Sequence, residues 1–575
     1  MKSLYTLIFL ALLPCFLQAQ LLFKYTKNET YSYTEATESY RSLEKTHPKQ
    51  CRLEKIGDSD IGQPIYLFVI SEDGDFDPAS LRKKGKTVLL INNAIHPGEP
   101  CGVDASVKLA NDLLEDKAFK KILKEVVVCI IPFYNVGGGL NRSCCSRANQ
   151  NGPTEYGFRG NAQNRDLNRD FIKCDTRNAF AFTKAFQTWN PDVFIDTHTT
   201  NGSDFQYVLT LITSQLDKYN PIMANLLRNS LVPDLYKDMA KKEMELIPYV
   251  YNLSNTPEGG IKDFLETPRF STGYATLFNT AAFVTEALKY KPYTDRVEHT
   301  YGFLMSNLEW MQKHKKELLD VRQRAIEDVK TRDSFDIAWA LDTSTYELID
   351  FKGYETEMQP SSFGDGAELL VYNHDKPFTK KIRYYNKYKA TVSVKKPAAY
   401  IIPQAYGAVI ERLKMNGIEM TRLASDTTIA VDMYFIENYE TVKMPYEGHY
   451  LHYNVKVRRE YLPVKFYKGD YVAQTNQVGN RYLVETLEPQ AMDAFFAWNF
   501  FDGILQQKEY FSPFSFEPLA VKLLEEDKYL REAFEQKKKE DADFAKDHYG
   551  QLYFIYTHSP YYEPTHNRYP VGRLP

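Results

Sequence analysis

The sequence lacks the features that would assign it to several specialised classes of protein. Its formal net charge is only −4 over 575 residues, and no basic stripe occurs, so nucleic acid is not an expected partner. It has only seven cysteines, which is too few for a scaffold held together by disulfides. Its one marked apolar run, at the N-terminus, is too short to span a bilayer comfortably, and no other long apolar stretch occurs. Stable membrane insertion is therefore not expected.

The remaining features are typical of a folded protein with more than one domain. Apolar residues make up 43% and charged residues 25%, and the chain is too long for one ordinary core. Its first residues, MKSLYTLIFLALLPCFLQAQ, combine a basic Lys2 with a short apolar run and a plausible cleavage site after Ala19. Residues 1–19 are therefore predicted to be a signal peptide rather than an uncleaved anchor, and the protein is expected to be periplasmic or extracellular.

From about residue 50 to 290, short apolar runs alternate with segments of helical periodicity. The runs at 86–94, 125–133, 192–198 and 281–288 have the composition of strands that are buried on both faces. The segments 103–116 and 176–189 between them carry apolar residues at helical spacing. The predicted fold class is α/β, with a mixed and mostly parallel sheet flanked by helices. In such sheets, ligands bind beyond the carboxyl ends of the strands.

A long amphipathic segment, residues 300–330, is predicted to be the helix that closes this first domain, which we place at residues 20–330. Residues 331–575 differ, because short stretches rich in Tyr and Val alternate with turn residues. They predict a β-rich C-terminal region whose role the sequence leaves open. Helical patterns return at 492–507 and from Leu519 to about Asp547, where the mixed charges of 535–547 indicate a solvated helix face.

Two polar residues follow the first apolar run, in the segment NNAIHPGEP, where His96 and Glu99 stand three residues apart. Alone, this spacing is weak evidence, because eleven histidines yield about one such pair by chance. His314 and Glu317 form a second pair, flanked by lysines, which is expected to face solvent. His198 ends another predicted strand and supplies a possible third ligand. Two histidines and one glutamate, with a fourth position left for water, are the open ligand set of a catalytic zinc site.

Further polar groups stand in two other segments. The segment NRDLNRDF places Asp166, Asn168 and Arg169 close together. Arg169 could hold a substrate carboxylate bidentately with help from Asn168, and Asp166 could orient a ligand imidazole. Glu286 lies within the apolar run FVTEAL, and a carboxylate buried there is costly unless it is functional or paired.

Taken in order, the HPGE segment at 96–99, the DLNR segment at 166–169, His198 and Glu286 resemble the motifs of the zinc carboxypeptidases over roughly residues 50–295. The resemblance implies one zinc ion held by His96, Glu99 and His198, with Glu286 as the general base. It also implies that Asn168 and Arg169 bind the terminal carboxylate of a peptide substrate, and that an upstream arginine stabilises the oxyanion.

The resemblance is less close at three positions. Arg159 has the spacing most similar to the cytosolic-type branch of the family and is the preferred oxyanion arginine, with Arg147 as second choice. The usual Asn-Pro-Asp-Gly segment reads Asn-Val-Gly-Gly from Asn135 onward. No tyrosine matches the family's substrate-capping residue, so Tyr274 is taken as the substitute, and Arg269 is a further candidate contact for a substrate carboxylate.

Three functions from different classes are therefore compared. The first is an exported zinc carboxypeptidase that acts on peptides with a free C-terminal carboxylate. The second is a zinc amidohydrolase, either for N-acyl amino acids, as in succinylglutamate desuccinylase and aspartoacylase, or for cell-wall peptides. The third is a metal-free binding protein. Predicted export and the long C-terminal region favour the peptidase. A glycan on Asn201, three residues from His198, would crowd the site, which favours a bacterial protein.

Overall fold

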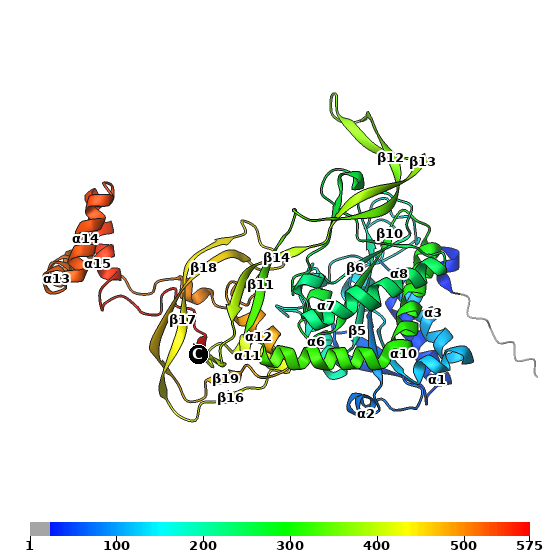
Figure 1. Cartoon of the computed structure of the whole chain (residues 1–575), viewed down its shortest axis with the longest axis horizontal. Helices are drawn as coiled ribbons and strands as arrows, with labels where there is room; N and C mark the ends of the chain where they lie inside the picture. The colour runs from blue at the N-terminus through cyan, green and yellow to red at the C-terminus, as the bar shows by residue number, and fades with distance from the viewer. Residues whose placement is uncertain (1–22) are drawn as a thin grey trace, which may run out of the picture.

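A computed structural model describes residues 23–575, and the predicted signal peptide at 1–19 lies outside the described residues. Figure 1 shows an α/β part built around a twisted sheet, with a β-rich region and a small group of helices following it. The predicted fold class is confirmed: the structure has a mixed sheet flanked by helices, then a β-rich C-terminal part. Within the described residues, no helix is both long enough and apolar enough to cross a bilayer.

The central sheet has eight strands in the order β1-β2-β4-β3-β5-β10-β6-β7. Its middle, β4-β3-β5-β10, is parallel, whereas β1, β2 and β6 pair antiparallel. The four predicted buried strands are β3, β4, β5 and β10, and their residues are almost all buried. The strands are β1 (Cys51–Asp58), β2 (Pro64–Ile70), β3 (Thr87–Asn92), β4 (Val126–Ile131), β5 (Val193–Thr200), β6 (Leu209–Thr213), β7 (Leu246–Pro248) and β10 (Ala281–Leu288).

Helices cover both faces of this sheet, and β5 shows how. Phe194 packs on Phe182 and Phe186 of α6. Thr197 lies three residues further along the strand, so its side chain points to the opposite face, where it contacts Gly102 of α3. The long α10 packs on α3, and its kink at His314 divides it. The helices of this part are α1 (Tyr33–Thr46), α2 (Pro78–Lys83), α3 (Cys101–Glu115), α4 (Lys120–Leu123), α5 (Val136–Leu140), α6 (Arg177–Trp189), α7 (Pro221–Leu226), α8 (Val232–Lys241), α9 (Ser271–Thr276) and α10 (Tyr293–Thr331).

The C-terminal part contains three smaller sheets. One is the pair β11 and β14, one joins the projecting hairpin β12–β13 to β8 and β9, and one has six strands in the order β16-β19-β15-β20-β17-β18. The strands are β8 (Tyr251–Asn252), β9 (Ile261–Lys262), β11 (Ser334–Leu341), β12 (Glu347–Pro360), β13 (Glu368–Tyr385), β14 (Tyr388–Lys395), β15 (Ala399–Ile402), β16 (Thr421–Arg422), β17 (Thr427–Thr441), β18 (His452–Phe466), β19 (Tyr471–Gln474) and β20 (Gly572–Leu574).

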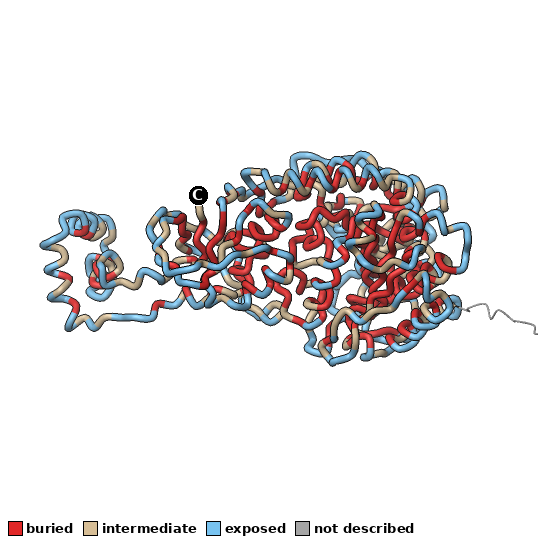
Figure 2. Tube along the Cα trace, turned by 90° about the horizontal axis from the view of Figure 1, so that it is seen from below, coloured by how far each residue is buried: buried red, intermediate tan, exposed pale blue. Residues whose placement is uncertain are grey.

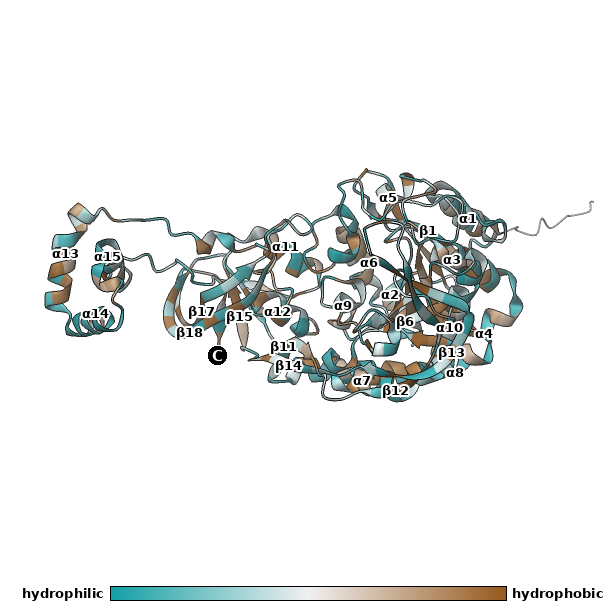
Figure 3. Cartoon of the chain, turned by 90° about the horizontal axis from the view of Figure 1, so that it is seen from above, coloured by the Kyte–Doolittle hydropathy of each residue, from teal (hydrophilic) through white to brown (hydrophobic). Residues whose placement is uncertain are grey.

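The C-terminal helices form two groups. α11 (Gly407–Met415) and α12 (Asn480–Leu487) lie between the six-stranded sheet and the α/β part (Figure 3). α13 (Pro513–Glu526), α14 (Lys528–Glu540) and α15 (His548–Thr557) form a separate module that is mostly exposed (Figure 2). The helical pattern predicted after Leu519 is thereby confirmed, including the exposed charges at the end of α14.

The helix predicted at 492–507 is wrong. This segment forms consecutive tight turns, and only Asp502–Leu505 is helical, as a 3-10 turn. Three of its aromatic residues, Phe495, Phe496 and Trp498, are fully buried. A segment that is apolar all round carries no period that distinguishes a helix from a buried turn.

Cysteine pairing, which the sequence left open, involves neighbours in the chain. Cys144 and Cys145 form a disulfide, and the other four cysteines within residues 23–575 are buried thiols.

A buried ion cluster at the start of β5 ties α10 to the sheet. Asp192 is fully buried and accepts hydrogen bonds from Arg82 at 2.8 and 2.9 Å, from Arg322 of α10 at 2.8 Å and from the Val88 amide at 2.9 Å. Removing this carboxylate leaves two cations without their partner, one of them fully enclosed.

We predict that Asp192→Ala lowers the free energy of unfolding by about 3–5 kcal/mol, because it leaves Arg322 as an uncompensated buried charge. Urea denaturation followed by circular dichroism measures the change. The matched control is Asp320→Ala, which removes an exposed partner of Arg324 on the same helix and should cost less than about 1 kcal/mol. Equal losses in the two variants would contradict the anchoring role of Asp192.

Candidate metal centre

The loop after β3 carries His96 and is held in a strained conformation. Ala94 has φ +54°, in the left-handed region that residues with a side chain seldom adopt. The loop is held by Asn135, whose backbone amide donates to the Ala94 carbonyl at 3.1 Å and whose side chain donates to the Ile95 carbonyl at 3.2 Å. The Asn-Val-Gly-Gly segment departs from the usual family motif, but its first residue, Asn135, supports the loop that carries His96.

Glu99 is placed by the close approach of α3 to β5. A Cβ atom at Gly102, in the first turn of α3, would lie 1.9 Å from Thr197 Oγ1, so only glycine fits there. This contact brings Glu99, two residues before α3, to the end of β5, where the Thr199 amide donates to Glu99 Oε2 at 2.9 Å.

Strand register places His198 and Glu286 on one face of the sheet. β5 and β10 are parallel, and Glu286 is the direct partner of His198. Because side chains alternate along a strand, aligned partners on adjacent strands point to the same face. The face is that of Phe194 and α6, on the opposite side from α3.

Three predicted ligands converge at the carboxyl ends of β3 and β5. His96 Nδ1 lies 3.1 Å from His198 Nδ1, and Glu99 places Oε2 3.0 Å from His198 Nδ1 and Oε1 3.4 Å from His96 Nδ1. All three residues are buried, and among residues 23–575 they are the one group of three such side chains able to share an ion. The second pair, His314 and Glu317 on α10, lies 2.9 Å apart, and no third such side chain of the described part of the chain completes a metal site with it.

The residues around the ligands fit a zinc ion. His96 Nε2 lies 2.8 Å from Asp166 Oδ1, and His198 Nε2 lies 3.2 Å from Asp196 Oδ2. Such carboxylates keep the ring proton on Nε2 and leave a lone pair on Nδ1. Two lone pairs that face each other repel unless a cation lies between them. Two nitrogens bound tetrahedrally to zinc would be roughly 3.3 Å apart, close to the separation found here.

The electrostatics of the cluster favour a charged glutamate. Burial raises the pKa of Glu99, but the Arg147 guanidinium and His96 outweigh it and hold that pKa well below its usual value. Burial lowers the pKa of His198, but Asp196 and Glu99 outweigh it and raise that pKa well above its usual value. The site therefore stabilises positive charge at its centre.

A cavity of about 220 Å³ opens on these ligands. It is also lined by Glu286 and by the predicted substrate residues Arg159, Asn168 and Arg169. Burial raises the pKa of Glu286 to about 7, against the lowering effect of His198. The cavity thus joins a cation site, a carboxylate with a near-neutral pKa and two guanidinium groups.

The structure separates the two candidate oxyanion arginines. Arg159 lines the cavity and donates to Asp166 Oδ2 at 3.0 and 2.9 Å. Arg147 does not line the cavity; it forms an ion pair with Glu99 and donates to the Thr199 carbonyl at 2.8 Å. Arg147 therefore contacts the predicted metal ligand Glu99 from outside the cavity, whereas Arg159 faces the cavity, where a substrate would lie.

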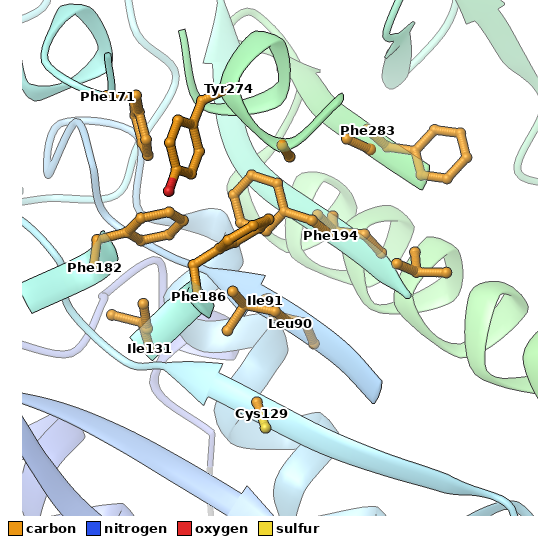
Figure 4. Packing of buried hydrophobic residues seen from close by; sticks show 14 of the residues in the cluster. Leu90, Ile91, Cys129, Ile131, Phe171, Phe182, Phe186, Phe194, Tyr274 and Phe283 are labelled. Atoms are coloured by element: carbon orange, nitrogen blue, oxygen red, sulfur yellow. The ribbon is translucent and has the colours of Figure 1, made fainter. Parts of the chain in front are cut away.

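Two predicted substrate contacts are placed elsewhere. Tyr274 is fully buried among aromatic rings that include Phe171 and Phe186 (Figure 4), and its hydroxyl donates to Asn416 Oδ1 at 2.6 Å. Arg269 forms an ion pair with Asp493, at 2.7 Å. Neither side chain lines the cavity, so both are corrected to packing and anchoring residues.

Sequence reasoning missed a tyrosine that does line the cavity. Tyr249 directly follows β7, and burial raises its pKa, with Glu286 as the next contribution. Its backbone amide donates to the Leu211 carbonyl at 3.0 Å, which continues the pairing of β7 with β6. Its position at a strand end was the available signal, but a three-residue edge strand is too short to predict.

Comparisons with known proteins agree with this geometry. Residues 37–207 match the family model described as zinc carboxypeptidase. No curated protein sequence matches the chain. Similar solved structures include a putative carboxypeptidase A from Shewanella denitrificans, with 17% identity and a TM-score of 0.39 over 50% of this chain and 70% of that one.

Two others are a metallo-carboxypeptidase from Pseudomonas aeruginosa, with 15% identity and a TM-score of 0.38 over 50% and 70% of the two chains, and the carboxypeptidase A of Helicoverpa armigera, with 14% and 0.36 over 52% and 74%. These low TM-scores carry no argument, and the assignment rests on the family match. Residues 37–207, which lie in the α/β part, are thus similar to the zinc carboxypeptidase family of metallopeptidases.

Proposed function

We propose that the protein is an exported zinc carboxypeptidase that removes residues from the free C-terminus of peptides. The observation that carries this proposal is the single cavity that joins His96, Glu99 and His198 to Glu286 and Arg169. Two buried imidazoles whose Nδ1 atoms lie 3.1 Å apart beside the Glu99 carboxylate support a cation site over a metal-free binding protein.

One zinc ion per chain is proposed to be held by His96, Glu99 and His198. When bound, it supplies a Lewis acid for the scissile carbonyl and lowers the pKa of water towards neutrality. The family is zinc-dependent, and the buried two-histidine, one-glutamate set supports a catalytic site with an open position.

Glu286 is proposed to be the general base. Its pKa of about 7, raised by burial, supports this role, because a carboxylate with that pKa can accept a proton from the attacking water and return it to the leaving amine near neutral pH. Asp166 contacts His96 Nε2 at 2.8 Å and Asp196 lies 3.2 Å from His198 Nε2, so both carboxylates are placed to leave the Nδ1 atoms for the ion.

Arg159 is proposed to stabilise the oxyanion. Asp166 fixes its guanidinium through two hydrogen bonds, so the positive charge is oriented before the substrate arrives. Its NH1 also lies 3.4 Å from Glu99 Oε1, which keeps it beside the ligand cluster.

Arg169 and Asn168 are proposed to bind the terminal carboxylate. Asn168 accepts a hydrogen bond from the Ser271 amide at 3.1 Å, which leaves its Nδ2 without a bonded partner within residues 23–575. Arg169 stacks on the Phe270 ring, 4.4 Å from its centroid, and its NH2 likewise makes no hydrogen bond to another described residue. Both groups line the cavity as unused donors, which suits a carboxylate.

Export through residues 1–19 and a catalytic domain at 20–330 are part of the same proposal. Tyr249 is proposed to take the capping role that the sequence assigned to Tyr274, because it lies in the cavity beside Glu286.

The first test compares two peptides that are identical except for a free or an amidated C-terminus. We expect the mature protein to release single residues from the free peptide at least about 100-fold faster, because amidation removes the charge that Arg169 and Asn168 read. Mass spectrometry follows the products. Inertness towards both peptides would contradict peptidase activity and favour the N-acyl amino acid or cell-wall peptide amidase.

The second test separates the two tyrosines. We expect Tyr249→Phe to raise KM for the free peptide about 3- to 10-fold while unfolding is unchanged, because one hydrogen bond to substrate is lost. Tyr274→Phe is the matched control and should leave KM unchanged but lower the free energy of unfolding by about 1 kcal/mol, through loss of the bond to Asn416. The reverse pattern would restore Tyr274 to the site.

A further inference from the structure

The C-terminal part of the chain sends one turn into the motif that carries Arg169. The connection between β17 and β18 contains the turn Tyr446–His449, whose two outer residues exchange backbone hydrogen bonds of 2.7 and 3.0 Å. The two central residues, Glu447 and Gly448, have φ of +51° and +85°. Positive φ at both positions is the pattern of a type I′ hairpin turn, which favours Asn-Gly.

A glutamate at a positive φ in such a turn is strained. The side chain and the carbonyl of Glu447 both make hydrogen bonds to the segment that carries Arg169. Glu447 Oε2 accepts a hydrogen bond of 2.8 Å from the backbone amide of Asp166. The Glu447 carbonyl accepts a second one from Arg165 NH1 at 3.4 Å. An Asn at this position would suit the turn better, but its side chain is one carbon shorter. Strain of this kind collects at functional positions.

The neighbouring Tyr446 holds the proposed carboxylate-binding arginine. Its hydroxyl accepts a hydrogen bond of 3.0 Å from Arg169 Nε. The Phe270 ring lies 4.4 Å from the same guanidinium. With Nε fixed by Tyr446 and NH1 donating to the Asn168 carbonyl at 2.8 Å, the guanidinium is oriented and NH2 stays available.

The turn itself is firmly anchored between the two parts of the chain. His449 Nε2 lies 2.7 Å from Asp175 Oδ2, and Arg412 of α11 lies 3.2 Å from Asp175 Oδ1. The Tyr446 ring stacks on Trp498, which is fully buried, with 6.1 Å between centroids. Arg269 lies 5.0 Å from the Trp498 ring and pairs with Asp493. A turn fixed on both sides can position the residues that it touches.

We infer that the Tyr446–His449 turn is a built-in part of the substrate site, in which Tyr446 positions Arg169 and Glu447 positions Asp166. Both act as positioning residues, because neither lines the cavity. The inference rests on the proposed function, and it gives the C-terminal region a role: it completes the carboxylate-binding wall that the α/β part provides.

The kinetic test uses Tyr446→Phe in the full-length mature protein with the free-C-terminus peptide. We expect KM to rise about 5- to 20-fold with kcat within twofold and with unchanged zinc content, because the hydroxyl acts on a residue that binds the same carboxylate before and during reaction. The matched control is Tyr450→Phe, since Tyr450 is 52% exposed and its hydroxyl makes no hydrogen bond to another described residue. Unchanged KM in Tyr446→Phe would overturn the inference.

A second measurement does not depend on activity. Hydrogen–deuterium exchange of the segment that contains Asp166 should be at least about tenfold faster in Glu447→Ala, because its amide loses its acceptor, and unchanged in Glu447→Gln, which keeps one. Unchanged exchange in Glu447→Ala would overturn the role of the turn. A wild-type protein inert on the peptide, with faster exchange in Glu447→Ala, would sink the proposed function and leave the positioning of Asp166 standing.

Discussion

The site depends on the burial of one carboxylate between two imidazoles. Glu99 lies 3.0 Å from His198 and forms an ion pair with Arg147, and the side chains of His96, Glu99 and His198 are all buried. Burying these charges is expensive unless each has a partner and a fixed position. Fixed positions are provided by the strained loop at Ala94, by the close contact at Gly102 and by Asp166 and Asp196 beside the two histidines. Together they form the candidate cation site.

Much of the metal centre could be predicted because its residues stand at strand ends or at short spacing. His96 and Glu99 follow β3, and His198 ends β5, so the topology of an α/β sheet brings them together. Glu286 could be found because a carboxylate interrupts an apolar strand, and its register opposite His198 explains why it shares their face. These signals can be read from the sequence because they depend on the position of each residue within or at the end of a single strand.

The remaining residues are placed by contacts that no local pattern records. Tyr249 follows an edge strand too short to predict, and Tyr446 comes from a turn that lies 277 positions from Arg169 in sequence. Tyr274 was misassigned because the sequence does not show whether an aromatic residue near a candidate arginine faces a cavity or packs in a core. The apolar segment at 492–507 was misassigned because burial on all sides removes the period that marks a helix.

The C-terminal part is integrated with the α/β part rather than attached to it. Asp175 is shared by His449 and Arg412 on one side and by Arg165 and Lys173 on the other. Strand β9, which precedes Glu286 in the chain, pairs with β13 of the projecting hairpin on one side and with β8 on the other. Such shared elements explain how a region without ligands of its own can shape the geometry of the site.

We propose that zinc binding and proton transfer are carried by different residues of one cavity. Glu286→Gln tests it most directly, because the substitution keeps the shape of the side chain and removes its basicity. Metal analysis and turnover of the free peptide are measured on the same samples of wild type and variant. We expect one zinc per chain in both proteins and a loss of turnover of at least about 100-fold in the variant. A zinc-loaded variant that keeps its turnover, or a wild type that binds no zinc, would contradict it.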